Sequence, residues 1–180
     1  MDRAQETMLN AGLIFIYSIW LQGQMSDLVI LKKNPELVVD FVADPAKIPA
    51  AYHELRVSYW ERQFGDVKKE FLEVFADQLT ELELKEIDEI YHVRNMIGHA
   101  HVSGGRDYML YRPSSSRKEK EVLAALNIKS ILDQADPVLI KLPFGQPEVF
   151  KSLSDKIEHL DQVCFARLAA SLRVPHGRVR

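Results

Sequence analysis

The chain has 180 residues, of which 47% are hydrophobic, and a formal net charge of −3. This length suits one domain with its own core, and this balance of apolar and charged residues excludes a disordered chain. A weakly acidic protein is not a general nucleic-acid binder of the highly basic kind, so any RNA contact must be local. The single cysteine, Cys164, excludes an internal disulfide and a cysteine-based zinc site in one chain.

The N-terminal third predicts one long helix. Residues 3–33 contain no proline, and Asn34-Pro35 predicts where the helix ends. The apolar run 11–21 is shorter than the roughly 20 residues that span a bilayer, and residues 1–10 lack the pattern of a signal peptide. We therefore expect a cytoplasmic protein with no membrane partner. Residues at three- and four-residue spacing form a broad apolar stripe on this helix: Met8, Gly12, Phe15, Ile16, Ile19 and Trp20.

Two further helical stretches follow after a proline-containing loop. The first covers residues 50–79, and Gly65-Asp66 predicts a break in it with Asp66 as a cap. The second begins at Thr80-Glu81-Leu82-Glu83, a capping box in which the threonine and Glu83 satisfy each other's backbone amides. The glycines of Ser103-Gly104-Gly105 predict the end of this helix.

The remainder of the chain predicts an irregular insertion and a last helix. Within residues 106–145, Tyr108–Tyr111 and Val138–Leu142 are strand-like and could pair as a hairpin, with a short helix at Glu121–Leu126 between them. Pro147 suits the first turn of a helix that continues to Leu172. Four amphipathic helices predict a mainly α protein with an antiparallel four-helix-bundle core. We expect one domain over residues 1–175 and a flexible tail at 176–180.

A pair of functional groups lies near the end of the third predicted helix, in the segment Arg94-Asn95-Met96-Ile97-Gly98-His99. Arginine supplies a permanent charge with a planar fork of donors that suits a phosphodiester. Histidine can accept or donate a proton near neutral pH, as cleavage of RNA through its own 2′-hydroxyl requires. The residue types therefore point to phosphodiester chemistry on RNA.

This combination resembles the higher eukaryotes and prokaryotes nucleotide-binding (HEPN) superfamily. Its members are small helical bundles marked by an arginine, four to six residues and a histidine, often with a polar residue after the arginine. The resemblance implies a metal-independent endoribonuclease without a cofactor, in which two subunits bring their motifs to one cleft. Arg94 and His99 would be catalytic, and Asn95 would orient the motif or the phosphate. It also implies a toxin or antiviral role with an antitoxin protein as a partner, and no DNA substrate.

The sequence also contains a second histidine within reach of the motif. His101 is a candidate helper, ranked after His99 because it lies nearer the fraying end of the helix. In toxins of this superfamily that are paired with a nucleotidyltransferase antitoxin, a tyrosine that becomes modified stands two residues after the histidine. His101 occupies that place here, which puts this form of control in doubt. Asp88 and His92 share a helical face, but without an H-E-x-x-H motif we expect no metal site.

Two questions stay open at the level of sequence. On an ideal helix Arg94 and His99 point about 140° apart, so either the helix is distorted at Gly98 or two subunits converge, and we prefer the second. Alternatively, both residues are structural: Arg94 would pair with Glu89, Glu86 or another acid across the bundle, and His99 would cap carbonyls. The protein would then be an unrelated helical interaction protein. A further alternative is a non-catalytic HEPN-like binding module that keeps the motif.

Overall fold

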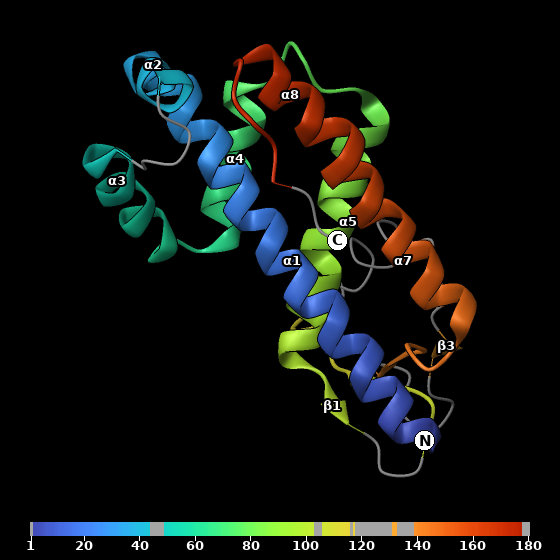
Figure 1. The fold of residues 1–180 in the computed structure, drawn as a ribbon. Helices are drawn as coiled ribbons and strands as arrows, with labels where there is room; N and C mark the ends of the chain where they lie inside the picture. Colours follow the sequence, from blue (N-terminus) through green and yellow to red (C-terminus); the bar gives the residue numbers. More distant parts are fainter. Residues whose placement is uncertain are drawn as a thin grey trace. The chain divides into compact units, whose positions relative to one another are not determined.

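The computed structural model describes residues 2–43, 49–102, 106–115, 117, 131–132 and 139–177. The chain is mainly helical, as predicted, and helices account for most of what is described (Figure 1). It folds as two compact units. Unit 1 consists of Met1–Ser18 and Asp88–Ile157, and unit 2 consists of Ile19–Ile87 and Glu158–Arg180. The arrangement as an antiparallel four-helix bundle stays a prediction.

Helix α1, Arg3–Lys33, has the bounds that the sequence predicts. It begins with a reciprocal cap. The backbone N–H of Gln5 donates to Asp2 Oδ1 at 2.8 Å, and the backbone N–H of Asp2 donates to Gln5 Oε1 at 3.1 Å. After α1, Pro35 opens α2, Pro35–Ala43. By length and composition alone α1 could cross a membrane, a test that the buried core helix of a soluble protein also passes. The cytoplasmic location therefore stays a prediction.

The apolar stripe of α1 is not the face that the sequence suggests. Met8, Ile16 and Ile19 are exposed to 45%, 61% and 48%. Because α1 is apolar over most of its circumference, periodicity alone does not decide which face is covered. The buried stripe runs along a neighbouring face, at Ala4, Thr7, Ala11, Ile14, Ser18, Leu21, Met25 and Leu28.

Unit 2 contains α3, Ala50–Trp60, and α4, Phe64–Val74. The break between them lies before Phe64, so the predicted break at Gly65-Asp66 is wrong. Gln63 takes the N-cap position, and Asp66 lies inside the first turn of α4. The helix is fixed by the burial of Phe64, Val67 and Phe71 on one face, which outweighs the local cost of a glycine. The rings of Phe71 and Phe165 meet edge to face with centroids 5.5 Å apart.

Helix α5, Glu81–His99, begins with the predicted capping box. The Thr80 amide donates to Glu83 Oε2 at 2.8 Å, and the Glu83 amide donates to Thr80 Oγ1 at 3.3 Å. The helix ends at His99, however, and not at the glycines, because strand β1, His101–Val102, begins after one residue. Pairing of β1 with its neighbouring strand replaces a further helical turn. The glycines at 104 and 105 lie outside the described residues.

The small sheet of unit 1 has the order β1-β2-β4-β3, with every pairing antiparallel. The predicted pairing of the two strand-like segments is confirmed, since β2, Met109–Tyr111, pairs with β4, Ile140–Leu142. Strands β1 and β3, Ile131–Leu132, are additions that the sequence does not reveal. The helix expected at residues 121–126 lies outside the described part of the chain.

The sheet packs on α1 through the turn after β4. Asn10 Nδ2 donates to the Phe144 carbonyl at 2.8 Å, and the Gly145 amide donates to the Asp107 carbonyl at 3.3 Å. A Cβ at Gly145 would lie 2.8 Å from the Asp107 carbonyl oxygen, so this close approach requires glycine. The turn therefore fixes the sheet against the N-terminal half of α1.

The last helical stretch follows the sequence prediction closely but contains a π turn. It consists of α7, Pro147–His159, the π-helical turn η1, Leu160–Phe165, and α8, Ala166–Ser171. Cys164 is buried, as expected for a small core residue. His176, which the sequence places in a flexible tail, is buried beside Asp161.

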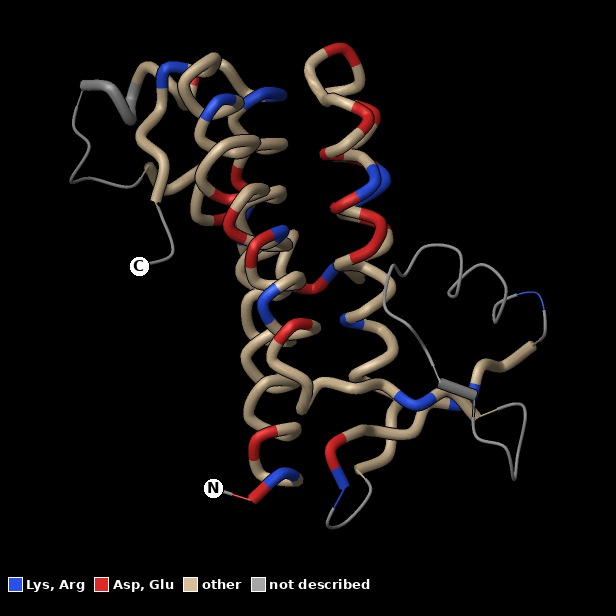
Figure 2. Tube along the Cα trace, turned by 90° about the vertical axis from the view of Figure 1, so that its right-hand side faces the viewer, with Lys and Arg blue, Asp and Glu red and all other residues tan. Residues whose placement is uncertain are grey.

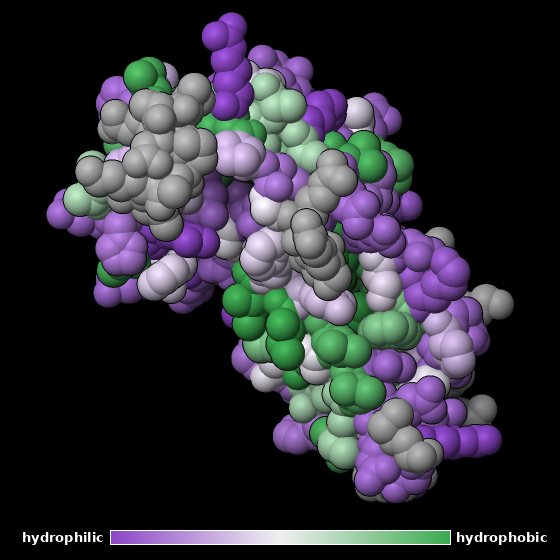
Figure 3. All heavy atoms as spheres, in the orientation of Figure 1, coloured by the Kyte–Doolittle hydropathy of each residue, from purple (hydrophilic) through white to green (hydrophobic). Residues whose placement is uncertain are grey.

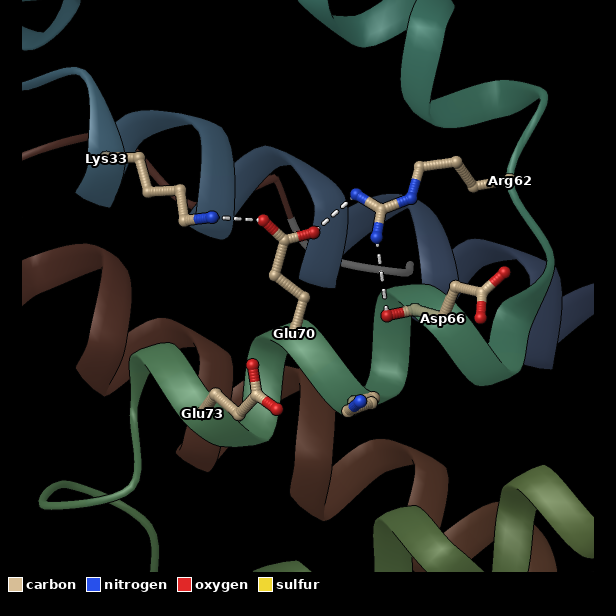
Figure 4. A pocket seen from close by; sticks show the side chains of 6 residues that line it. Lys33, Arg62, Asp66, Glu70 and Glu73 are labelled. Atoms are coloured by element: carbon tan, nitrogen blue, oxygen red, sulfur yellow. Dashed lines mark hydrogen bonds and ion pairs between the residues drawn. The ribbon is translucent and has the colours of Figure 1, made fainter.

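In unit 2 a charged cluster joins α1, α4 and the loop between α3 and α4 (Figure 4). Glu70 accepts hydrogen bonds from Lys33, Arg62 and the Tyr59 hydroxyl, the last at 2.9 Å. Burial alone would raise the pKa of Glu70, but these three donors outweigh it and lower the pKa to about 2. The hollow beside the cluster has a volume of about 530 Å³, and the described residues that line it are all charged, including Asp66, Lys69 and Glu73.

This cluster predicts a pH-dependent stability. Because the pKa of Glu70 is lower in the folded state, its ionised form stabilises the fold at pH values above the ordinary pKa of 4.5. This stabilisation is lost as the pH falls toward about 2. Glu70→Gln should lower the free energy of unfolding by about 1–2 kcal/mol at pH 7, the cost of a partly exposed charged bond. Urea unfolding should show the difference from the unsubstituted protein shrinking between pH 4.5 and 2. Glu73→Gln, in the same hollow, is the matched control, and an equal loss there would contradict the assignment.

Candidate functional site

All four residues predicted for the site lie in unit 1, on α5 and the strand that follows it. Arg94 and Asn95 are half-buried in the last two turns of α5. His99 is exposed at the C-terminal end of the helix, and His101 is exposed on β1. The structure therefore exposes two histidines, at the end of α5 and on β1, and partly covers Arg94.

The Arg94 guanidinium is held by two neighbours. Its Nη1 donates to Asn95 Oδ1 at 3.0 Å. Its central carbon lies 5.4 Å from the centroid of the Phe15 ring on α1, a distance at which the ring face attracts a cation. Its Nε is buried and has no hydrogen-bond partner. The charge is thus fixed in position while part of its bonding capacity is unused.

The acids that could have neutralised Arg94 are engaged elsewhere. Glu86 Oε2 lies 2.6 Å from His159 Nδ1, and Glu89 Oε2 lies 2.6 Å from Lys156 Nζ. Figure 2 marks the acidic residues along α5 in red. Among the described residues Arg94 forms no ion pair with a carboxylate. The interpretation of Arg94 as the structural partner of Glu86 or Glu89 is therefore wrong.

The helix continues through Gly98 to His99, so the distortion considered there as the less favoured alternative is not observed. Gly98 faces Phe15, and a Cβ there would lie at an ordinary distance of 3.9 Å from Phe15 Cε2. Asn95 and His99, four residues apart, share a helical face to within about 40°. Because the guanidinium of Arg94 is bonded to Asn95, its charge is drawn toward the face that carries His99.

The two histidines are available for contact with a ligand. In the part of the chain that is described, neither His99 nor His101 makes a side-chain hydrogen bond or ion pair, so the capping role considered for His99 is not observed. His101 stands opposite Leu110 in the sheet, on a strand at the sheet edge. The expectation that His101 lies on the fraying helix is thus wrong, since the strand fixes its backbone.

The third histidine of this region, His92, already has side-chain partners. His92 Nε2 lies 3.4 Å from Asp88 Oδ2, one helical turn away, and its ring meets that of Tyr91 edge to face. Over the described ranges, no group of three or more histidine, cysteine or acidic side chains is arranged to hold a metal ion. His92 therefore belongs to the surface of α5 and not to the exposed pair.

Comparison with protein-family models, with curated proteins and with solved structures gives no match.

Phe15 belongs to the site in the structure, but it is not recognisable as a site residue from the sequence. Its only sequence signal is an aromatic residue on the apolar face of α1, which is equally typical of a core position. Its contact with Arg94 joins residues 79 positions apart in the chain. No spacing rule reveals a contact of that separation.

The cation–π contact gives a prediction that is independent of any activity. A double-mutant cycle with Phe15→Leu and Arg94→Met should give a coupling free energy of about 0.5–1 kcal/mol, as expected for a partly covered pair. The measurement is chemical denaturation of the four proteins. The same cycle on Phe15 and Arg106, two residues that do not contact each other, serves as the control. Equal coupling in both cycles would contradict a specific contact.

Proposed function

We propose that the chain is a HEPN-type, metal-independent endoribonuclease that cleaves single-stranded RNA. One observation carries the proposal: a guanidinium with no carboxylate partner among the described residues is fixed by Asn95 and Phe15, five residues before an exposed histidine on the same helix. A fixed cation whose charge is not neutralised suits an anionic ligand, and an imidazole nearby suits proton transfer. The spacing is that of the superfamily motif.

In the proposed reaction the ribose 2′-oxygen attacks the adjacent phosphorus while the bond from phosphorus to the 5′-oxygen breaks. One imidazole accepts the proton of the 2′-hydroxyl, and a second imidazole donates a proton to the departing 5′-oxygen. The products are a 2′,3′-cyclic phosphate and a 5′-hydroxyl. Arg94 stabilises the negative charge that builds on the non-bridging oxygens in the transition state. Asn95 positions the guanidinium, and His101 assists His99.

A composite site in a homodimer supplies the two proton-transfer groups. Two copies of His99 provide an acceptor and a donor, and two copies of Arg94 line the groove between them. The exposed apolar face of α1 supports the dimer, because it borders the face on which Phe15 contacts Arg94. Figure 3 shows apolar surface gathered over the middle of α1. The exposed apolar side chains of this helix are Met8, Leu9, Ile16 and Ile19.

A toxin or antiviral role, with an antitoxin protein as a partner, rests on the superfamily resemblance alone. A DNA strand lacks the 2′-hydroxyl that the proposed reaction needs, so DNA should bind without being cut. We further propose that the enzyme uses no cofactor, as the resemblance implies, and that it is cytoplasmic.

The catalytic prediction uses a fluorescent single-stranded RNA in buffer with a chelator. Arg94→Ala and His99→Ala should each lower the cleavage rate by roughly 10²-fold or more, the usual contribution of a proton-transfer group or charge clamp. Asn95→Ala and His101→Ala should have smaller effects. His92→Ala is the matched control, because His92 pairs with Asp88 on the same helix and should keep full activity. Circular dichroism checks that each variant is folded.

The outcomes separate the candidate functions. If the unsubstituted protein produces a 2′,3′-cyclic phosphate and both Arg94→Ala and His99→Ala do not, the result supports an endoribonuclease. Binding of RNA without product at any protein concentration would identify a non-catalytic binding module, and full activity in Arg94→Ala and His99→Ala would exclude the assigned site.

The composite site makes a separate prediction for Ile16, which is 61% exposed on α1. Ile16→Glu places a charge on the proposed dimer face without entering the core, so it should leave helicity unchanged. Sedimentation analysis should show dissociation of the dimer, and cleavage should fall with it. The control is Val57→Glu, at an exposed position on α3. An Ile16→Glu protein that is monomeric and fully active would contradict the composite site.

A further inference from the structure

Unit 2 contains a partly enclosed pocket of about 170 Å³ that the proposed ribonuclease does not use. It lies among α1, α3, α8 and the segment 174–177. Leucines of α1 and the Val174-Pro175 segment form apolar walls. The polar groups that line the pocket are Gln24, Asp27, Tyr52 and His176. Apolar walls with a few converging polar groups are the usual composition of a small-molecule site.

In the pocket lining, the imidazole of His176 is oriented by a buried carboxylate behind it. His176 Nε2 lies 3.1 Å from Asp161 Oδ1, and the two side chains are exposed to only 8% and 1%. Asp161, in the π turn η1, also accepts from Trp20 Nε1 at 3.3 Å. A hydrogen on Nε2 that bonds Asp161 leaves Nδ1 of the neutral ring as an acceptor. No described residue hydrogen-bonds that nitrogen.

Asp27, a second polar residue of the lining, is held by Tyr52 and Arg56. The Tyr52 hydroxyl is hydrogen-bonded to the Asp27 carboxyl group, and Arg56 Nε lies 3.0 Å from Asp27 Oδ1. That ion pair lacks hydrogen-bond geometry, so Asp27 Oδ1 is buried without a hydrogen bond. Burial raises the pKa of Asp27 and also that of Tyr52. A buried acceptor with unused capacity is costly unless something donates to it.

From this geometry we propose that the pocket binds a compact, single-ring ligand that presents N–H donors and is neutral or cationic. The volume suits one ring, since an apolar cavity of about 150 Å³ takes benzene. The two acceptors in the lining are His176 Nδ1 and Asp27 Oδ1, and the apolar walls would contact the ring faces. The described lining of the pocket contains the Asp27 carboxyl group and neither lysine nor arginine, which disfavours an anion. This inference does not rest on the ribonuclease proposal.

The test compares two probes of the same size and opposite charge, benzamidine and benzoate. Calorimetry on the full chain should show saturable binding of benzamidine at one site and none of benzoate at the same concentrations. In a ¹H–¹³C spectrum of the histidine rings, benzamidine should shift the signal of His176 and leave that of His53, which is exposed on α3, unchanged.

Variants then assign the contacts. Asp27→Asn and His176→Gln should each weaken benzamidine binding at least about tenfold, as expected for a charge-assisted or buried hydrogen bond. Asp77→Asn and His53→Gln, at exposed positions, are the matched controls and should bind as the unsubstituted protein does. If either pocket variant fails to fold, the His176 signal in the unsubstituted protein decides the question.

Three results would overturn the proposal. They are binding of benzoate as tight as that of benzamidine, unchanged affinity in folded Asp27→Asn and His176→Gln, and no binding of benzamidine to the unsubstituted protein. In each case the buried pair of Asp161 and His176 would serve only to fasten the segment 174–177.

Discussion

The arrangement of helix α5 depends on the pairing of its buried carboxylates. Glu83, Glu86 and Glu89 are exposed to less than 8%, and an unpaired buried carboxylate costs several kcal/mol. In unit 2, Arg167 Nη2 lies 2.8 Å from both carboxylate oxygens of Glu83, and His159 pairs with Glu86. In unit 1, Lys156 pairs with Glu89. Each acid must meet its partner, so the rotation and register of α5 are fixed by the last helical stretch.

This pairing has a direct effect on the candidate site. Because side chains of the last helical stretch pair with Glu83, Glu86 and Glu89, these acids do not pair with Arg94. The neighbours that hold Arg94 are an amide and an aromatic ring, which position a guanidinium without cancelling it. The same helix therefore has a neutralised half and a half with a retained positive charge. This difference in charge between the two halves of α5 arises from side-chain pairing and not from the local sequence of the motif.

Local signals in the sequence predicted much of the fold. The bounds of α1, the capping box at Thr80, the start of the last helix at Pro147 and the pairing of β2 with β4 follow from capping, proline placement and alternation. What the sequence could not give depends on contacts between distant segments. The exposed face of α1, the end of α5 at His99 and the contact of Phe15 with Arg94 are all of this kind.

The site was predictable only as a set of residue types. The sequence locates Arg94, Asn95, His99 and His101 and assigns their chemistry, but it cannot say which charges neutralise which. The pairs of Glu86 with His159 and Glu89 with Lys156 join positions 73 and 67 residues apart. His176 shows the same limit, since its partner Asp161 is recognisable only once the chain has folded back.

The π turn in the last helical stretch adjusts the angular phase of the helix. On an uninterrupted α-helix, His159 and Arg167, eight residues apart, would point about 80° away from each other. A π turn accommodates one extra residue, so the two behave as if seven apart and differ by only about 20°. Both can then face α5, where Glu86 and Glu83 accept them. Leu160–Phe165 thus acts as a rotational spacer, and winding the same residues into a regular α-helix would turn α8 and its arginine away from the acid that it pairs with.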